Sequence, residues 1–239
     1  MKLHGLQKMT LLDFPGHVAC TVFLGGCDFR CPYCHNFELA DGTAEPQMDE
    51  EEFFSFLGKR KGLLDGVAVT GGEPCLHREL PGFLEKVRGM GFGTKLDTNG
   101  HHPELLREIL ERGLADYVAM DIKNSPEKYN MTCGLDSREG AGALPGADLS
   151  RIRESIRLIM EKAPDYEFRT TVVREFHEAA DFEEMGKMIA GAKNYYLQSF
   201  TDRDTVPFEG FHAPDPDSLK KYADIARKYV ANVQVRGVE

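Results

Sequence analysis

Six short runs of apolar and β-branched residues recur along the chain, and amphipathic helical patterns fill the intervals between them. Each run is bounded by glycine or other turn residues, and together they cover residues 17–24, 66–70, 93–97, 117–122, 166–173 and 194–200. A run that is apolar throughout is typical of a strand buried on both faces. Strands that alternate with helices predict parallel pairing through right-handed crossovers. The sequence therefore predicts an α/β fold, either an open doubly wound sheet or a partial barrel.

The intervals carry apolar residues at helical spacing, which indicates helices packed on the sheet by one face. These patterns cover residues 80–87, 105–110, 149–159, 182–189 and 219–229. Asp148 stands just before the third of them and is expected to cap that helix. A final apolar run at 232–235 is expected to extend the edge of the sheet.

Length and charge limit the class of protein. The 239 residues fit one α/β domain of barrel size, or two small ones, and can bury a core without disulfides. No apolar stretch reaches the length of about 18 residues that a membrane span requires. The net charge of −10 argues against nucleic acid or an anionic membrane as the main partner. Residues 1–10 lack the apolar run of a secretory signal, so a cytoplasmic location is expected.

Three cysteines lie close together in the pattern C-x3-C-x2-C. Cys27, Cys31 and Cys34 span eight residues, which favours metal ligation in a reducing compartment over disulfides. A [4Fe–4S] cluster held entirely by protein takes four cysteines. Three thiolates would leave one iron open to another ligand. Gly25 and Gly26 allow the chain to turn tightly just before the first cysteine.

Two other interpretations of the same residues stay open at this point. Cys31-Pro-Tyr-Cys34-His35 also matches the C-x-x-C-H pattern of c-type haem attachment. That attachment goes with export, and it leaves Cys27 unexplained. A structural zinc site of the Cys3His type would need His35 to fold back beside Cys34. Neither interpretation accounts for the other polar motifs of the chain.

Polar motifs stand at the carboxyl ends of three predicted strands, where barrel active sites lie. Gly71-Gly72-Glu73-Pro74 follows the second strand, Asp97-Thr98-Asn99-Gly100 the third and Asp121-Ile122-Lys123 the fourth. The glycine pair can bring backbone groups close to a ligand, and the glutamate could accept a hydrogen bond from an ammonium group. The two aspartates suit a hard cation or other polar contacts. Helix capping and turn formation are the alternative explanation of these motifs.

Together the motifs resemble those of the radical S-adenosylmethionine (SAM) enzymes, and within them the glycyl-radical-enzyme activating enzymes. The resemblance rests on CPYCHN at 31–36, GGEP at 71–74, DTNG at 97–100 and DIK at 121–123. The DFPG segment at 13–16 is similar to a motif near the start of those enzymes. The opening segment and the closing NVQVRG are most similar to a short subgroup assigned as anaerobic ribonucleoside-triphosphate reductase activating proteins.

The resemblance implies a partial (β/α)6 TIM-like barrel of the radical SAM fold. It implies that Cys27, Cys31 and Cys34 hold one [4Fe–4S] cluster and that SAM chelates the open iron. Tyr33 would lie near the adenine. The resemblance implies that Gly71, Gly72 and Glu73 contact the methionine of SAM. It implies that Asp97, Thr98 and Asp121 contact the methionine carboxylate, directly or through a monovalent cation such as Na⁺ or K⁺.

The implied activity is reductive cleavage of SAM to a 5′-deoxyadenosyl radical, which takes hydrogen from a backbone glycine of a partner glycyl radical enzyme. The expected partner is an anaerobic ribonucleotide reductase, and the expected electron donor is a flavodoxin or a ferredoxin. Three alternatives remain: activation of another glycyl radical enzyme such as pyruvate formate-lyase, radical SAM chemistry on a small molecule as in a deazapurine synthase, and non-catalytic metal binding.

A single domain spanning residues 1–239 is expected. Some activases insert a ferredoxin-like domain with further cysteines after the cluster loop, which here covers residues 25–36, whereas residues 37–65 contain no cysteine. One cluster is therefore predicted. Cys20 lies in an apolar run and is expected to be a buried core thiol. Cys75 and Cys133 are far from the triplet in sequence and are predicted to be dispensable for the cluster.

Overall fold

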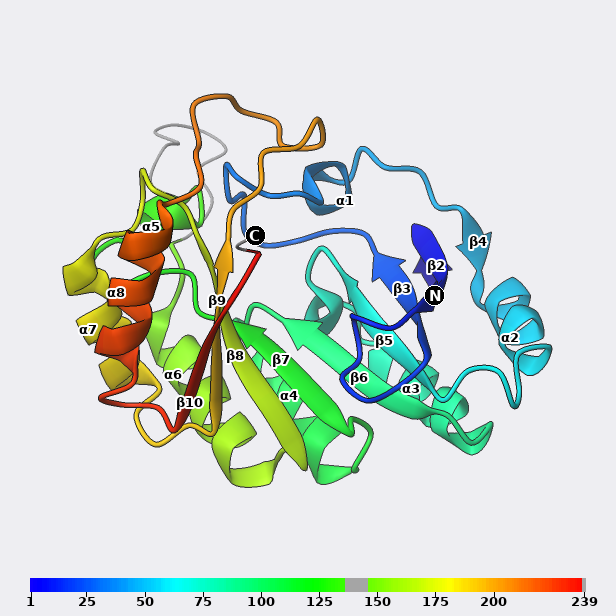
Figure 1. Ribbon diagram of the computed structural model, residues 1–239. Coiled ribbons are helices and arrows are strands. Elements are labelled where there is room, and N and C mark those ends of the chain that lie inside the picture. The colour runs from blue at the N-terminus through cyan, green and yellow to red at the C-terminus, as the bar shows by residue number, and fades with distance from the viewer. Residues whose placement is uncertain (136–145, 238–239) are drawn as a thin grey trace.

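An eight-stranded sheet forms the centre of the computed structural model, which describes residues 1–135 and 146–237 (Figure 1). The order of the strands is β10-β9-β8-β7-β6-β5-β3-β2. Their bounds are Gly5–Thr10 for β2, Ala19–Leu24 for β3, Gly66–Gly71 for β5, Gly93–Thr98 for β6, Tyr117–Asp121 for β7, Asp165–Val172 for β8, Asn194–Ser199 for β9 and Asn232–Arg236 for β10. All neighbours pair in parallel except β2, which is antiparallel to β3.

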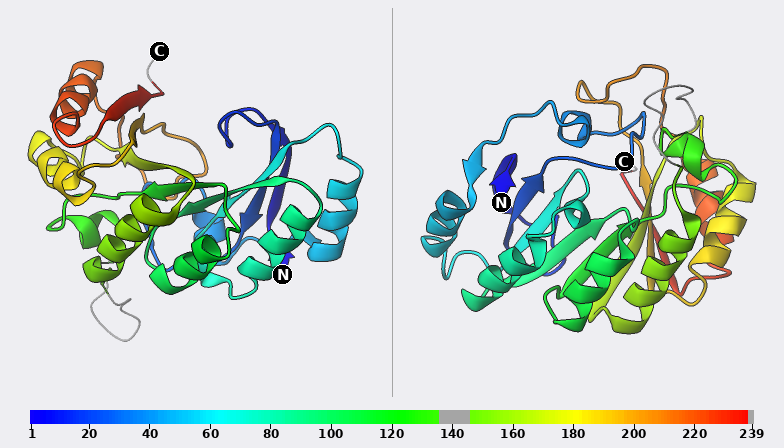
Figure 2. Two further views of the ribbon diagram at one scale, coloured as in Figure 1. Left: turned by 90° about the horizontal axis from the view of Figure 1, so that it is seen from below. Right: turned by 180° about the vertical axis from the view of Figure 1, so that it is seen from behind.

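The parallel strands follow one another in sequence order, and this singly wound order selects the partial barrel over the doubly wound sheet. Seen from below in Figure 2, the sheet curves with β2 and β10 at its two edges. Within residues 1–135 and 146–237 these two edge strands are not paired with each other, so the barrel is open on one side. The outer face is covered by five helices, α3 (Leu80–Gly89), α4 (Pro103–Glu111), α6 (Leu149–Lys162), α7 (Ala179–Met188) and α8 (Pro216–Ala226).

Each of the six predicted strands is present, with both ends within two residues of the expected bounds. Burial of all but one residue in each of β3 and β7 explains why an apolar run without alternation marked them. β10 adds the predicted edge strand. Asp148 caps α6 by accepting a hydrogen bond from the amide of Ser150. β2 was not predicted, because its mixed sequence carries no strand pattern and its pairing depends on the edge of β3.

Several short elements also escaped prediction. Helix α2 (Glu50–Gly58) begins with a capping box in which Asp49 and Glu52 exchange hydrogen bonds, a signature that the sequence does carry. The others are α1 (Phe37–Asp41), α5 (Tyr129–Thr132), a 3₁₀ turn at Pro74–Leu76 and the small sheet of β1 (Lys2–Leu3) with β4 (Met48–Asp49). No helix in the described parts of the chain is long and apolar enough to cross a bilayer.

The DFPG segment closes the floor of the barrel, at the amino ends of the parallel strands. Phe14 is 2% exposed and packs with Tyr117 at the start of β7. A Cβ atom on Gly66, the first residue of β5, would lie 2.8 Å from the Phe14 ring. The Lys95 ammonium donates to the carbonyl oxygen of Asp13 from inside the barrel. The polar motifs therefore gather at the opposite, carboxyl end.

Candidate functional site

One cavity lies at the carboxyl ends of the parallel strands, and nine of the ten predicted site residues line it. Its empty volume, including the open mouth, is about 860 Å³, within the range of pockets that hold small-molecule ligands. The nine residues are Cys27, Cys31, Tyr33, Cys34, Gly71, Gly72, Asp97, Thr98 and Asp121. The tenth, Glu73, lies behind the wall. The fold thus brings together four motifs that are up to 94 residues apart in the sequence, from Cys27 to Asp121.

The cluster loop between β3 and α1 is shaped by hydrogen bonds to its own backbone. The amide of Phe29 donates to Sγ of Cys27 at 3.3 Å, a contact that suits a ligating thiolate. The Arg30 guanidinium donates to the carbonyl oxygens of Cys27 and Phe29. Arg30 therefore holds the turn of the loop, a structural role that the sequence did not indicate.

Burial controls the ionisation of two of the thiols. It raises the pKa of Cys27 far above its usual value, with the Glu73 carboxylate adding to the effect, and it raises the pKa of Cys34 to about 11. Both are therefore protonated at neutral pH until a metal displaces the proton. These thiols need a strong cationic partner to become thiolates, and iron would supply it.

Cys31 differs because Cys133 lies beside it: the amide of Arg30, the residue before Cys31, donates to the carbonyl oxygen of Cys133 at 2.8 Å. The Cys133 side chain lowers the pKa of Cys31, against the effect of burial. Cys133 is fully buried at the end of α5. The sequence separation of the two cysteines concealed this contact, since α5 returns the chain to the cluster loop.

The arrangement of donors argues against the Cys3His zinc site. Nε2 of His35 is 2.6 Å from the carbonyl oxygen of Thr201, and its ring stacks on Phe200. His35 is thus engaged with the segment after β9. Among the described residues, the cluster-loop cysteines do not belong to any group of three donors within 4.8 Å of one another, the spacing suited to a single ion. Three thiols distributed around a cavity suit a larger centre that contains several irons.

The glycine pair of GGEP is required by close backbone packing against β3 and the start of the cluster loop. Gly71 has a φ of +121°, and a Cβ there would overlap the backbone of Leu24. A Cβ on Gly72 would overlap the carbonyl oxygen of Gly26, which itself accepts from the amide of Glu73 at 2.8 Å. The two glycines line the cavity, and they also fix the cluster loop to the end of β5.

Glu73 lies behind the wall of the cavity, and its expected contact with the methionine stays a prediction. It is 1% exposed, and its carboxylate accepts from the amide of Cys75 at 2.9 Å, the hydroxyl of Thr98 at 2.8 Å and the amide of Asn99 at 2.6 Å. Burial raises its pKa. The carboxylate is therefore committed to the DTNG turn, where it positions Thr98 and Asn99 at the cavity wall.

Arg169, in the middle of β8, joins the two aspartates of the cavity. Its guanidinium lies 3.0 Å from Oδ1 of Asp121 and 3.3 Å from Oδ2 of Asp97. Lys123 is 2.9 Å from the other oxygen of Asp121. Burial alone would raise the pKa of Asp121, but the two cations lower it to about 2. The repulsion expected between the two carboxylates is thus offset by protein charges. An arginine inside a buried β-branched run was the available signal for this role.

One carboxylate oxygen at the cavity keeps an open position. Oδ1 of Asp97 is buried and has no hydrogen-bond partner among the described residues, and Lys95 is 3.4 Å away. An ammonium, a hydroxyl or a cation could be received there. Lys95 and Arg169 already supply positive charge beside Asp97, so its carboxylate does not require a metal ion for charge balance. The monovalent cation stays a prediction.

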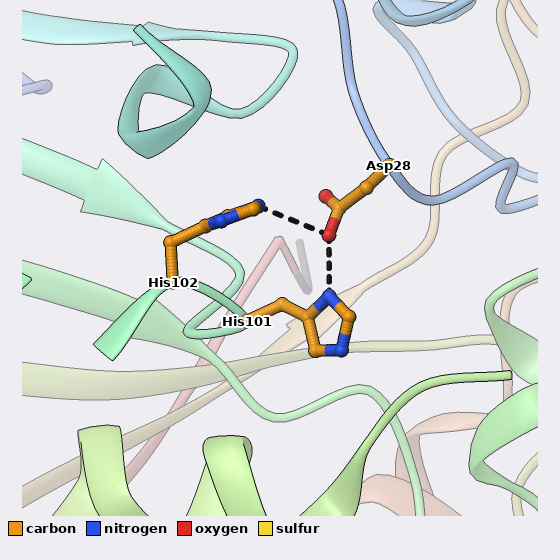
Figure 3. A group of neighbouring side chains, drawn as sticks. All are labelled: Asp28, His101 and His102. Atoms are coloured by element: carbon orange, nitrogen blue, oxygen red, sulfur yellow. Dashed lines mark hydrogen bonds and ion pairs between the residues drawn. The ribbon is translucent and has the colours of Figure 1, made fainter. Parts of the chain in front are cut away.

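Asp28, His101 and His102 form a polar cluster beside the cavity that the sequence did not reveal (Figure 3). Oδ2 of Asp28 lies 2.5 Å from Nδ1 of His101 and 3.1 Å from Nε2 of His102. Its other oxygen accepts from the side-chain amide of Asn99 at 2.8 Å. The cluster links the residue after Cys27 to the loop that follows β6.

A second contact of His101 indicates its tautomer and limits what this cluster can bind. The Asp148 amide donates to Nε2 of His101 at 3.0 Å. A neutral ring that accepts at Nε2 carries its proton on Nδ1 and donates it to Asp28. That nitrogen then has no lone pair for a metal. The geometry therefore supports a hydrogen-bonded connection between the cluster loop and α6 rather than a metal site.

The sequence profile of the Radical SAM superfamily matches residues 21–189, which include most of β3, the cluster loop and all of β5 to β8. The chain is 30% identical over 241 residues to a Methanocaldococcus jannaschii protein whose provisional name is glycyl-radical enzyme activating enzyme. That alignment covers 98% of this chain and 95% of the relative.

Two further relatives match over shorter segments. Identity to the pyruvate formate-lyase-activating enzyme of Clostridium pasteurianum is 34% over 143 residues, covering 57% of this chain and 59% of that protein. Identity to the 7-carboxy-7-deazaguanine synthase of Thermococcus kodakarensis is 29% over 127 residues, covering 45% of this chain and 49% of that protein.

Solved structures share the fold at low sequence identity. Streptococcus suis SuiB bound to its precursor peptide SuiA superposes with a TM-score of 0.67 at 14% identity, covering 92% of this chain and 48% of that one. TYW1 with a lysine-pyruvate adduct superposes with a TM-score of 0.57 at 15% identity, covering 88% of this chain and 73% of that one. The profile match and the full-length relative show that the chain belongs to the radical SAM superfamily, whose members use a [4Fe–4S] cluster and SAM, and is an enzyme of the glycyl-radical-enzyme activating type.

Proposed function

We propose that this protein cleaves SAM reductively. The resulting 5′-deoxyadenosyl radical then abstracts a hydrogen atom from a glycine of an anaerobic ribonucleotide reductase. The observation that carries the proposal is the convergence of the cysteine triplet, the GGEP turn and the two aspartates on one cavity. The full-length likeness to a glycyl-radical enzyme activating enzyme supports the same class of reaction.

In this proposal Cys27, Cys31 and Cys34 hold one [4Fe–4S] cluster. The cluster, when bound, supplies the electron that breaks the C5′–S bond of SAM. The cavity residues hold and orient SAM and exclude water. The backbone at Gly71 and Gly72 forms one wall.

The charged residues of the cavity would receive the polar groups of SAM. The open oxygen of Asp97 suits its ammonium or ribose hydroxyls, whereas Lys123 and Arg169 suit its carboxylate. Thr98 is held at the wall by Glu73. Tyr33 lines the cavity beside Phe176, with ring centroids 5.7 Å apart, and offers an apolar surface for the adenine. No side chain needs to act as a general acid or base.

The partner is proposed to insert a glycine-bearing loop through the open side of the barrel. Anaerobic ribonucleotide reductase is favoured by the similarity of the opening and closing segments to its activating proteins. A flavodoxin or ferredoxin is the proposed electron donor. We also propose that residues 1–239 act as one radical SAM domain with a single cluster, since residues 37–65 add no further cysteine.

Electron paramagnetic resonance tests the proposal. Anaerobically reconstituted protein, mixed with reductant, SAM and the reductase, should produce the doublet of a glycyl radical on the reductase. Replacing the target glycine of the reductase by alanine should remove the doublet while the cluster spectrum of this chain persists. Production of 5′-deoxyadenosine without a doublet on any glycyl radical enzyme of the same organism would contradict it.

Pyruvate formate-lyase is the second candidate partner, because 143 residues are 34% identical to an activating enzyme of that lyase. The same experiment with the lyase in place of the reductase distinguishes the two. A small-molecule substrate is the remaining alternative, given the shorter likeness to a deazaguanine synthase. Stoichiometric consumption of SAM with a small molecule alone would favour it.

A further inference from the structure

Asn99, in the DTNG turn, is held in one orientation by the hydrogen bonds around it. Its side-chain oxygen accepts from the backbone amide of His101 at 2.9 Å. Its own backbone amide donates to Oε2 of Glu73 at 2.6 Å, and the residue is 6% exposed. The oxygen and nitrogen of an asparagine side chain are assigned from such a network. Because the His101 amide requires an acceptor, the oxygen faces His101 and the NH2 group faces the other way.

The NH2 group of Asn99 faces the first cysteine of the cluster loop. Nδ2 lies 3.9 Å from Sγ of Cys27 and 2.8 Å from Oδ1 of Asp28. An NH2 group carries two hydrogens, so it can serve both acceptors at once. Asn99 and Cys27 both line the cavity. The amide of Phe29 reaches the same sulfur from within the cluster loop, so Asn99 adds a donor that comes from a different strand end.

We propose that the Asn99 side chain donates a hydrogen bond to Sγ of Cys27 when that sulfur ligates iron, and thereby raises the reduction potential of the cluster. This inference rests on the proposed ligation of iron by Cys27. A ligating thiolate carries no proton and can only accept. The NH2 group of an asparagine can donate without any change of ionisation. Asn99 is in this view a tuning residue rather than a ligand.

The direction of the effect follows from the charge that reduction adds. The added electron increases the negative charge on the cluster and on its thiolate sulfurs, and hydrogen bonds to those sulfurs help to set the potential. A donor therefore stabilises the reduced state more than the oxidised state. Oδ1 of Asp28 also lies 3.9 Å from Sγ of Cys27 and acts in the opposite direction. Because Asn99 donates to that oxygen too, it offsets the negative charge beside the sulfur.

Two substitutions separate the NH2 donor from the turn that carries it. Asn99→Ala removes both side-chain polar atoms. Asn99→Ser removes the NH2 group but keeps an oxygen that can accept from the backbone two residues further on, as in a serine turn. Asn124→Ala is the matched control. Asn124 is 0% exposed, is not among the residues lining the cavity, and donates through its NH2 group to Thr132 and Phe176.

Each protein is reconstituted anaerobically, and its iron is counted. Its midpoint potential is measured by a redox titration followed by electron paramagnetic resonance, and its stability by urea unfolding. All three variants are expected to bind as much iron as the wild type. The potential should become more negative by a similar amount in both Asn99 variants and stay unchanged in Asn124→Ala. Stability should fall in Asn99→Ala and Asn124→Ala, and fall less in Asn99→Ser.

Intact clusters with the wild-type potential in both Asn99 variants would overturn the inference. An equal shift of potential in Asn124→Ala would overturn it too, because a general loosening of the fold would then explain the change. Loss of iron from both folded Asn99 variants would overturn it in favour of a purely structural role. A wild-type chain that binds no cluster would instead overturn the proposed function on which the inference depends.

Discussion

At the scale of single residues, chemistry that is local in sequence was predictable and chemistry that depends on folding was not. The spacing of Cys27, Cys31 and Cys34 predicted the cluster loop, because the three cysteines lie within eight residues of sequence. Arg169 lies 48 residues beyond Asp121 and contacts it across adjacent strands. The hydrogen bonds of Glu73 to Thr98 and Asn99, 25 and 26 residues further along the chain, were not predicted either. Such partners follow from strand register, which the sequence does not state.

Asp121→Asn tests the charge network of the cavity. The variant leaves Arg169 and Lys123 without their shared carboxylate. At pH 7 its free energy of unfolding should be about 2 kcal/mol lower than that of the wild type, a loss between those typical of exposed and of buried ion pairs. The ionised side chain stabilises the fold above the unfolded pKa of about 3.9, and this contribution disappears as the pH falls toward the folded pKa of about 2. The difference between variant and wild type in urea unfolding should therefore shrink from pH 7 to pH 3.

Asp224→Asn is the matched control. Asp224 forms an ion pair with Arg227 on the surface of α8 and is 60% exposed. Surface pairs contribute about 0–1 kcal/mol, so this variant should change little at either pH. A stability difference for Asp121→Asn that is the same at pH 7 and pH 3 would refute the charge-based explanation.

Glu73→Gln tests the positioning role of the buried carboxylate. Glutamine presents one oxygen and one NH2 group, so either the Cys75 amide or the Asn99 amide loses its acceptor. Leaving a buried donor unpaired costs about 1–3 kcal/mol, and the free energy of unfolding in urea should fall by that amount. Glu79→Gln, at an exposed position without a side-chain cap contact, should leave it unchanged. Equal effects of the two substitutions would argue against the role of Glu73.

At the scale of elements, the strands were predictable because burial on both faces leaves an apolar run. The long helices were predictable from their apolar stripes. Short elements such as α5 were not, since four residues contain no helical period. Yet α5 carries Cys133 to the cluster loop, and its position depends on the contact between Gly134 and Arg30.

Gly72→Ala tests the contact between the end of β5 and the cluster loop. The added methyl group would overlap the Gly26 carbonyl oxygen and force the two segments apart. A loss of about 1–3 kcal/mol in stability is expected from such overpacking, together with less iron per chain after reconstitution. Gly82→Ala in α3 has open space around the new methyl group and should be neutral or stabilising by up to about 1 kcal/mol. A Gly72→Ala protein with full iron content would contradict the proposed contact.

At the scale of the whole molecule, alternating strands and helices left two topologies, and the resemblance to a known family favoured the barrel. The edge strand β2 could not be predicted, because its sequence carries no strand pattern and it forms only by pairing with β3 in the folded sheet. The lateral opening likewise follows from the curvature of the sheet.

Iron content tests the organisation of the whole chain. One [4Fe–4S] cluster corresponds to about four irons per chain, and replacing Cys27, Cys31 or Cys34 by alanine should abolish it, because two thiolates hold a cube poorly. Cys75→Ala should keep the full content. About eight irons per chain in the wild type would show a second cluster and would contradict the single-cluster proposal.

The floor that Phe14 makes has a consequence for the rate of the proposed reaction. With the amino end of the barrel closed, SAM and its two fragments pass through the carboxyl mouth or the lateral gap. These are the same openings that a partner's loop would cover. Spent fragments would then leave after the partner does, so each encounter yields one turnover, and a tighter complex makes a slower catalyst.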